Sequence, residues 1–96
     1  MKPSAALRLH RSEVRSIVAA YYARNARAFG SAASGEDTEA SDLGVLVDTT
    51  PETTLMDIGA IRYELRKLLG VPVDVLTPRA LPDAFRERVL TEALPV

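Results

Sequence analysis

The residue types and spacing that could support chemistry are found at Gly30-Ser31, Asp42 and Asp74. Gly30-Ser31 stands at the end of a short predicted strand, 26–29, and small residues come after it. Glycine lets the backbone approach a ligand closely, and exposed amides beside a serine hydroxyl suit a phosphate group. Most Gly-Ser dipeptides are plain turns, however. The pair alone therefore indicates only a candidate phosphate-binding turn.

The aspartates stand next to or within apolar runs. Asp42 directly precedes the run 43–47, where an aspartate can equally begin a strand or cap a turn. Asp74 lies inside the apolar segment 71–76. Burying a lone carboxylate in a strand is costly unless it is paired or binds a metal. The alternative for Asp74 is an exposed position on the solvent face of an edge strand.

The elements that must position these residues follow from hydrophobic periodicity and from turn residues. The first helix can begin at Ser12 or nearer to Ser4, and Gly70 stands where the helix 55–69 should end. The segment 31–41 is small and polar, which predicts a loop with one short helical turn after Ser31. We expect helices over 7–25, 55–69 and 82–93, and strands over 26–29, 43–47 and 71–76.

This order of elements predicts an α/β (α+β) fold in which a small mixed sheet of about three to four strands is covered by helices. The leucine-rich helix 55–69 is expected to be core. The last helix is expected to face the core with one set of apolar side chains, namely Ala84, Phe85, Val89, Leu90 and Ala93. The length of 96 residues suits a single domain over 1–96.

Composition narrows the classes of partner. A net charge of −1 lacks the broad basic field of non-specific nucleic-acid binding, so DNA or RNA is not the expected partner. The chain has no cysteine, which excludes disulfides and thiolate metal sites. No apolar run approaches the length of a membrane span or of a signal-peptide core, so we expect a cytoplasmic protein.

The whole pattern resembles the minimal nucleotidyltransferases, whose wider fold includes DNA polymerase beta. That family carries Gly-Ser, a short loop, Asp-x-Asp and a third Asp on a later strand. The corresponding residues here are Gly30-Ser31, Asp42-Leu43-Gly44 and Val73-Asp74-Val75, and the segment 85–90 is similar to the closing helix of the family.

The resemblance implies a nucleotidyltransferase fold that uses Mg²⁺ and ATP. It assigns nucleotide binding to Gly30 and Ser31, and both catalysis and metal binding to Asp42 and Asp74. Carboxylates two residues apart on a strand point to the same face, and a third on a neighbouring strand completes a cluster for one or two Mg²⁺ ions.

The chain departs from the family where the second Asp is expected, because position 44 is Gly. Asp48 shares that face but lies about 13 Å further along the strand, too far to substitute. An acid of the 31–41 loop could swing in instead. The arginine that often follows Gly-Ser is also missing, since Ser34 stands in its place. Whether the chain is an enzyme therefore stays open.

The resemblance also implies a partner, a HEPN-domain ribonuclease toxin that the family neutralises by transferring AMP to a tyrosine or by binding. Two hypotheses follow for this chain: an adenylylating antitoxin, or a catalytically impaired antitoxin or scaffold that only binds. Transfer to a small molecule such as an aminoglycoside is disfavoured, because those relatives normally carry a further substrate domain. Assembly into a homo-oligomer is left open.

Overall fold

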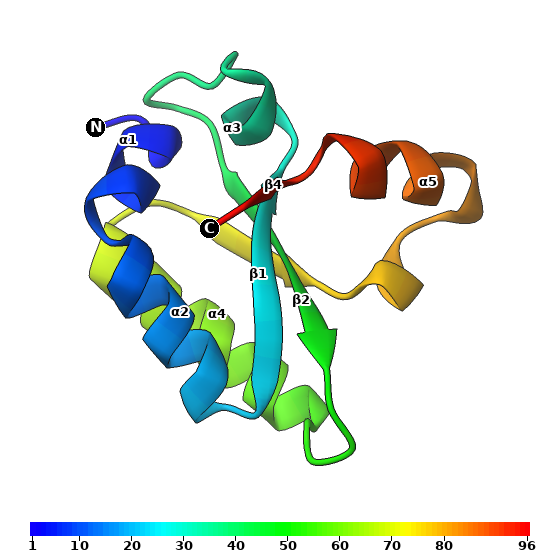
Figure 1. Ribbon diagram of the computed structural model, residues 1–96. Helices are drawn as coiled ribbons and strands as arrows, with labels where there is room; N and C mark the ends of the chain where they lie inside the picture. Colours follow the sequence, from blue (N-terminus) through cyan, green and yellow to red (C-terminus); the bar gives the residue numbers. More distant parts are fainter.

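In the computed structural model, which describes residues 1–96, four strands form one mixed sheet in the order β3-β2-β1-β4 (Figure 1). The strands are β1 (Ala23–Phe29), β2 (Leu43–Thr49), β3 (Val73–Leu76) and β4 (Leu94–Pro95). The helices are α1 (Pro3–Leu9), α2 (Arg11–Ala20), α3 (Ser31–Ser34), α4 (Leu55–Leu69) and α5 (Asp83–Glu92), with a 3-10 turn, η1 (Pro78–Ala80). The predicted fold class is confirmed.

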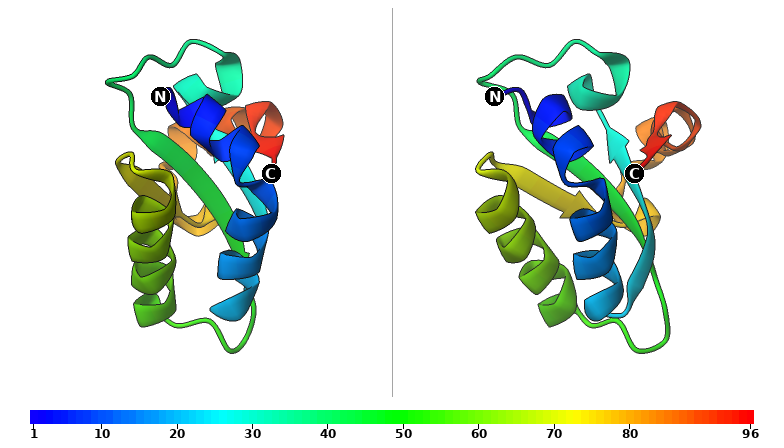
Figure 2. Two further views of the ribbon diagram at one scale, coloured as in Figure 1. Left: turned by 90° about the vertical axis from the view of Figure 1, so that its left-hand side faces the viewer. Right: turned by 60° about the vertical axis from the view of Figure 1, so that its left-hand side comes forward.

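The helices α1, α2 and α4 cover one face of the sheet, and α5 lies on the other side (Figure 2). Side chains alternate between the two faces of a strand. Those of β2 and β3 that point towards α2 and α4 are apolar and buried, and they meet the buried side chains of the two helices. The centre of this core consists of Val14, Val18, Leu43, Val45, Val47, Ile61, Leu65 and Val73.

The crossover from β2 through α4 to β3 sets the parallel pairing of these two strands. α4 begins at a capping box, in which the Thr54 hydroxyl accepts from the Asp57 amide and the Asp57 carboxylate accepts from the Thr54 amide. It ends at Gly70, whose φ of +68° is the left-handed conformation of a helix C-cap. The predicted bounds 55–69 are confirmed. Leu55, however, is 90% exposed and does not belong to the buried stripe.

The predicted single helix over 7–25 is wrong in two places. His10 leaves helical geometry and separates α1 from α2, and the chain becomes a strand already at Ala23. Tyr22 and Asn25 have positive φ values of 65° and 55°, which a helix does not allow. Pairing of β1 with β2 prevails over helical propensity here, and the hydroxyls of Thr50 and Thr53 hold the Tyr22 carbonyl.

The prediction that α5 packs into the core is also wrong. No residue of α5 is buried, and Phe85 and Leu90 are 56% and 39% exposed. The face of the sheet that needs covering is already occupied by α1, α2 and α4. After α5 the chain returns as β4 and pairs antiparallel with β1, with Leu94 opposite Ala28. No helix combines the length and the apolar character needed to cross a membrane.

The loop 35–42 is attached to α1 through Asp37. This carboxylate is only 4% exposed and accepts hydrogen bonds from the Ser4 amide (2.8 Å) and the Ser4 hydroxyl (3.0 Å). The bond from the Ser4 backbone, reinforced by that from its hydroxyl, outweighs burial and holds the pKa of Asp37 below its ordinary value of 3.8. Asp37 therefore serves to cap α1 rather than reaching into the candidate site.

We expect Asp37→Asn to destabilise the protein near neutral pH. Because the folded state lowers the pKa of Asp37, its contribution is complete above pH 3.8 and fades as the pH falls through the lowered value. Urea unfolding at several pH values checks this, and the gap between wild type and variant should shrink below pH 3.8. Glu39→Gln, at an exposed ion pair with the N-terminus, serves as the control. Equal stability of wild type and Asp37→Asn would contradict the role of Asp37.

Candidate functional site

The sheet register brings the candidate residues to one end of the sheet. Gly44 in the middle of this region pairs with Asp74 of β3 on one side and with Phe29 of β1 on the other. Asp42 lies just before β2, two residues from Gly44, and alternation gives both positions the same face of the strand. Gly30 follows Phe29 directly. The topology therefore brings Gly30, Asp42 and Asp74 to the same end of the sheet, and Ser31 follows Gly30 directly.

The turn at Gly30 has the conformation that only glycine adopts readily. Its φ is +76° and its ψ is −147°, and the short helix α3 begins at the next residue, Ser31. An added side chain at position 30 would meet no atom within 4 Å, so conformation rather than space requires glycine here. The predicted short helical turn after Gly30-Ser31 is confirmed.

The two aspartates are both exposed to solvent. Asp42 lies at the end of the loop before β2, and Asp74 lies on β3, which is an edge strand. Asp74 therefore does not carry the cost of a buried lone carboxylate. It has the exposed edge-strand position that the sequence left open as the alternative. Their roles as metal ligands stay predictions.

Position 44 carries no carboxylate, and another side chain fills the space where one would stand. A Cβ atom built on Gly44 would lie 2.7 Å from Cζ of Phe29 and 2.8 Å from Cε1 of the same ring. Carbon atoms pack at about 3.5–4.0 Å. The Phe29 ring thus lies directly against Gly44, on the face of the sheet to which Asp42 and Asp74 also belong.

The donors do not fit the magnesium cluster that the resemblance implies. No group of three or more Asp, Glu, His or Cys side chains comes together anywhere in the chain in a way that could hold a metal ion. Two carboxylates are available at the site, Asp42 and Asp74, and the ring of Phe29 occupies the third position. A two-ion centre needs a bridging carboxylate that this arrangement does not supply.

Asp48, as expected from its distance along β2, belongs to a different cluster. It accepts hydrogen bonds from Nδ2 of Asn25 (2.8 Å) and from Nη1 of Arg27 (2.9 Å). Burial opposes the ionisation of Asp48, but these bonds and the positive charge of Arg27 together outweigh it and lower the pKa of Asp48. A bulge in β1 between Arg24 and Arg27 turns the two donors towards this carboxylate.

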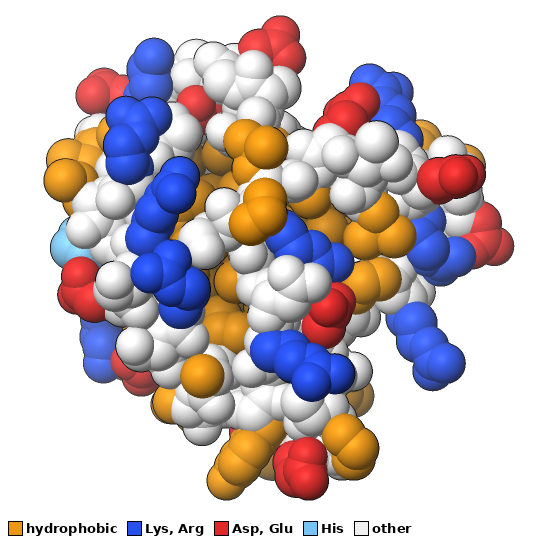
Figure 3. Space-filling model, in the orientation of Figure 1, with side chains coloured by type: hydrophobic (Ala, Val, Ile, Leu, Met, Phe, Trp, Pro, Cys, Tyr) orange, Lys and Arg blue, Asp and Glu red, His pale blue; other side chains and the backbone are white.

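A hollow of about 630 Å³ opens beside the Gly30 turn, between α3 and α5. Figure 3 shows the notch that separates the α5 lobe from the rest of the surface, with hydrophobic side chains where the two parts meet. The hollow is lined by Phe29, Gly30, Ala33, Ser34, Glu36, Phe85, Arg88, Val89 and Glu92. Gly30 belongs to it, whereas Ser31, Asp42 and Asp74 do not.

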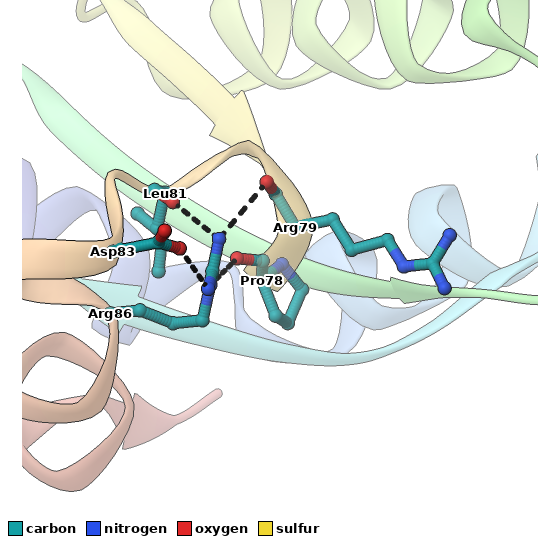
Figure 4. Close-up of polar contacts among 5 residues, drawn as sticks. All are labelled: Pro78, Arg79, Leu81, Asp83 and Arg86. Carbon is teal, nitrogen blue, oxygen red and sulfur yellow. Dashed lines mark hydrogen bonds and ion pairs between the residues drawn. The ribbon is translucent and has the colours of Figure 1, made fainter.

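α5 is held in place by Arg86, whose guanidinium binds the turn that precedes the helix (Figure 4). Arg86 donates to the carbonyls of Pro78 (2.9 Å), Leu81 (2.8 Å) and Arg79 (3.4 Å), and it pairs with the Asp83 carboxylate at 2.6 Å. The pattern of residue types did not single out Arg86 or Phe29, because both act through tertiary contacts. The only signal for Phe29 was its position before Gly30.

Comparison with known proteins places this arrangement in a family. The pattern described as "Nucleotidyltransferase domain" matches residues 7–96. The chain belongs to the nucleotidyltransferase domain family. Its likeness to the minimal nucleotidyltransferases, predicted from Gly30-Ser31, Asp42 and Asp74, is likewise confirmed.

Individual relatives of this nucleotidyltransferase domain support the assignment. A provisionally named protein adenylyltransferase of Methanocaldococcus jannaschii is 38% identical over 73 residues, which cover 76% of this chain and 78% of the relative. A second protein of that organism with the same kind of name is 28% identical over 92% of this chain and 87% of its own length.

Solved structures agree in fold. One that is provisionally described as a minimal nucleotidyltransferase superposes with a TM-score of 0.86 at 42% identity, covering 97% of this chain and 95% of its own. A toxin–antitoxin crystal structure with AMP-PNP superposes with a TM-score of 0.73 at 16% identity, over 88% of this chain and 69% of that one. The second likeness concerns the fold alone.

Proposed function

We propose that this chain is an antitoxin of the minimal nucleotidyltransferase type that neutralises a HEPN-domain ribonuclease in the cytoplasm by binding it, without needing nucleotidyl transfer. The fold that this chain shares with a toxin–antitoxin structure supports a toxin as the partner, and the resemblance to the minimal nucleotidyltransferases supplies the HEPN class. The single domain 1–96 acts as a binding unit in this proposal, and it keeps a nucleotide site at Gly30, Ser31, Asp42 and Asp74.

The observation that carries this proposal is the packing of Phe29 on Gly44. Nucleotidyl transfer depends on charge stabilisation at the transferred phosphate, and loss of a single electrostatic group can lower the rate by about 10²–10³-fold. Here the middle carboxylate is missing and an aromatic ring stands in its space. A surface that binds a partner protein loses nothing by that change.

The test uses the protein encoded by the neighbouring reading frame, if that protein is small and helical and carries the HEPN motif Arg-x₄-His. Cells that express this toxin should recover growth equally with wild type and with Asp42→Ala. The toxin isolated from either strain should show no mass increment of one AMP. Glu87→Ala, an exposed carboxylate on α5, is the matched control.

The proposal that binding alone neutralises the toxin would be overturned by two results together: a folded Asp42→Ala variant that no longer rescues growth, and an AMP adduct on the toxin from the wild-type strain. A neighbouring protein without the HEPN motif would overturn the proposed class of partner.

Adenylylation of a toxin tyrosine with Mg-ATP is the second candidate. The relative at 38% identity, which is named as a protein adenylyltransferase, favours it, as does the glycine turn at position 30. Radiolabelled ATP with purified toxin separates the two candidates. Under this second candidate Asp42→Ala and Asp74→Ala should both abolish labelling, while Glu87→Ala should not.

A further inference from the structure

We propose that a groove between α2 and β1 is the docking site for an extended, acidic segment of a partner protein. The inference rests on the proposed function for the identity of that partner, which is the toxin. The groove has a volume of about 280 Å³. It is lined by two arginines, Arg15 and Arg24, by the amide of Asn25 and otherwise by apolar residues, and no Asp or Glu belongs to the lining.

Positive charge is concentrated in the elements that form this groove. Six of the twelve Lys and Arg residues precede Gly30 in the sequence, whereas Glu13 is the only acidic residue there. Figure 3 shows Lys and Arg side chains gathered over α1, α2 and β1, with hydrophobic side chains between them. Because the whole chain has a net charge of −1, the residues after Gly30 carry an excess of negative charge. The groove therefore lies at the positive side of a strongly dipolar molecule.

The two arginines of the groove are exposed, and no carboxylate side chain of the protein neutralises them. Arg24 takes part in no ion pair. Nη1 of Arg15 donates to the backbone oxygen of Val96 at 3.1 Å, and its Nη2 donates to the Ser12 hydroxyl at 3.3 Å. Arg15 is thus oriented by these contacts while its charge stays available to a partner. The planar fork of a guanidinium matches a carboxylate, with which it forms paired hydrogen bonds.

The acidic residues of the neighbouring elements already have other partners. Glu13 of α2 pairs with Nδ1 of His10 at 2.8 Å. Asp48 of β2 pairs with Nη1 of Arg27 at 2.9 Å, and Arg24 lies outside ion-pair distance of that carboxylate. The protein itself therefore supplies no acid to the groove, and carboxylates from another molecule would complement it.

The apolar floor favours a peptide segment over nucleic acid. The residues between the two arginines are small or aliphatic, among them Val18, Ala19 and Ala23, and no aromatic ring lines the groove on which a base would stack. The edge of β1 is also free here, because β4 pairs with it only at Arg27 and Ala28. An extended segment would direct its apolar side chains to the floor and its carboxylates to the guanidinium groups on the walls.

The groove is separate from the end of the sheet that carries Gly30. It shares no lining residue with the hollow beside that turn. Glu36 and Glu92 line the hollow, and Asp42 and Asp74 are exposed at the same end of the sheet, so an acidic partner would be repelled there. A partner bound in the groove is held away from the predicted transfer site, which agrees with neutralisation by binding alone.

The experiment measures the association rate of the full chain with the toxin of the rescue assay by stopped flow at several salt concentrations. Wild type should associate fast at low salt and slowly at about 1 M salt, where the Debye length is about 3 Å. Arg15→Glu combined with Arg24→Glu should lower the rate constant by about 10- to 1,000-fold at low salt. Arg15→Lys combined with Arg24→Lys should associate nearly as fast as wild type, because the positive charge remains.

The matched control is Arg62→Glu combined with Lys67→Glu, which changes the net charge by the same amount at exposed positions of α4. Its association rate should fall far less. The inference is overturned if the reversal in the groove slows association no more than the reversal on α4, or if salt leaves the wild-type rate unchanged. It is also overturned if single-stranded poly(dT) displaces the toxin from wild type, since the groove would then be a phosphate-binding surface.

Failure of this inference is distinguishable from failure of the proposed function. If wild type and the Arg15→Glu, Arg24→Glu variant bind the toxin at the same rate and both rescue growth, the inference is wrong and the proposed function stands. If wild type does not bind the toxin at all, the proposed function is wrong and the inference falls with it.

Discussion

Replacing Gly44 by Asp is expected to lower the free energy of unfolding by about 1–3 kcal/mol, the usual cost of overpacking. The new Cβ would lie 2.7 Å from the Phe29 ring, so the ring must leave its position. Phe29→Ala should remove that conflict. In the Phe29→Ala background the penalty of Gly44→Asp should therefore be smaller than in the wild-type background.

A double-mutant cycle measured by urea unfolding checks this coupling, which we expect to be about 0.5–3 kcal/mol. Gly59→Ala is the control, because a Cβ there meets no atom within 4 Å and the extra methyl group should stabilise α4 by about 0.5–1 kcal/mol. Additive effects of Gly44→Asp and Phe29→Ala would contradict the packing described for the site.

The same variants at positions 29 and 44 test whether this end of the sheet can bind Mg-ATP. With the ring removed and Gly44 replaced by Asp, the site would hold three carboxylates, at positions 42 and 44 of one chain segment and at position 74 of the neighbouring strand β3. Titration with Mg-ATP should therefore show tighter binding in the double variant than in either single variant or in wild type. If all four proteins bind Mg-ATP equally, the assignment of this sheet end as the nucleotide site is wrong.

Replacing Arg86 by Ala is expected to release α5 from the rest of the molecule. The guanidinium supplies three bonds to backbone carbonyls and one to the Asp83 carboxylate. Because the Arg86 side chain is 37% exposed and water replaces part of these bonds, we expect a total loss of about 1.5–3 kcal/mol, the contribution of one hydrogen bond to a charged group. Because α5 buries no side chain, nothing in the core replaces these contacts.

Hydrogen exchange measures this release directly. Loss of about 1.5–3 kcal/mol corresponds to a fall in amide protection of about 10- to 150-fold, confined to α5 and to β4. The amides of β2 should keep their protection, because they lie in the core that α5 does not cover.

Arg79→Ala is the control for Arg86→Ala. The Arg79 side chain points away from the Arg86 guanidinium, and its contribution to the cluster is its carbonyl, which the variant keeps (Figure 4). Protection of α5 should be unchanged in Arg79→Ala. Uniform loss of protection throughout the chain in Arg86→Ala would instead mean that α5 belongs to the cooperative core.

Elements with strong local signals could be predicted from the sequence. The helix 55–69 has an apolar stripe, a Thr54–Asp57 capping box and a terminal glycine, and these act within a few residues of one another. The glycine turn at position 30 and the family resemblance were likewise visible, because both depend on short motifs in the chain.

Features that depend on which strand or helix lies next to which became visible only in the folded chain. Strand pairing forced Tyr22 and Asn25 out of the expected helix, and the filling of one sheet face by other helices left α5 outside the core. The contact of Phe29 with Gly44 joins residues far apart in the sequence through the β1–β2 register. Local patterns cannot contain such information, since cross-strand neighbours and free sheet faces exist only after the chain has folded.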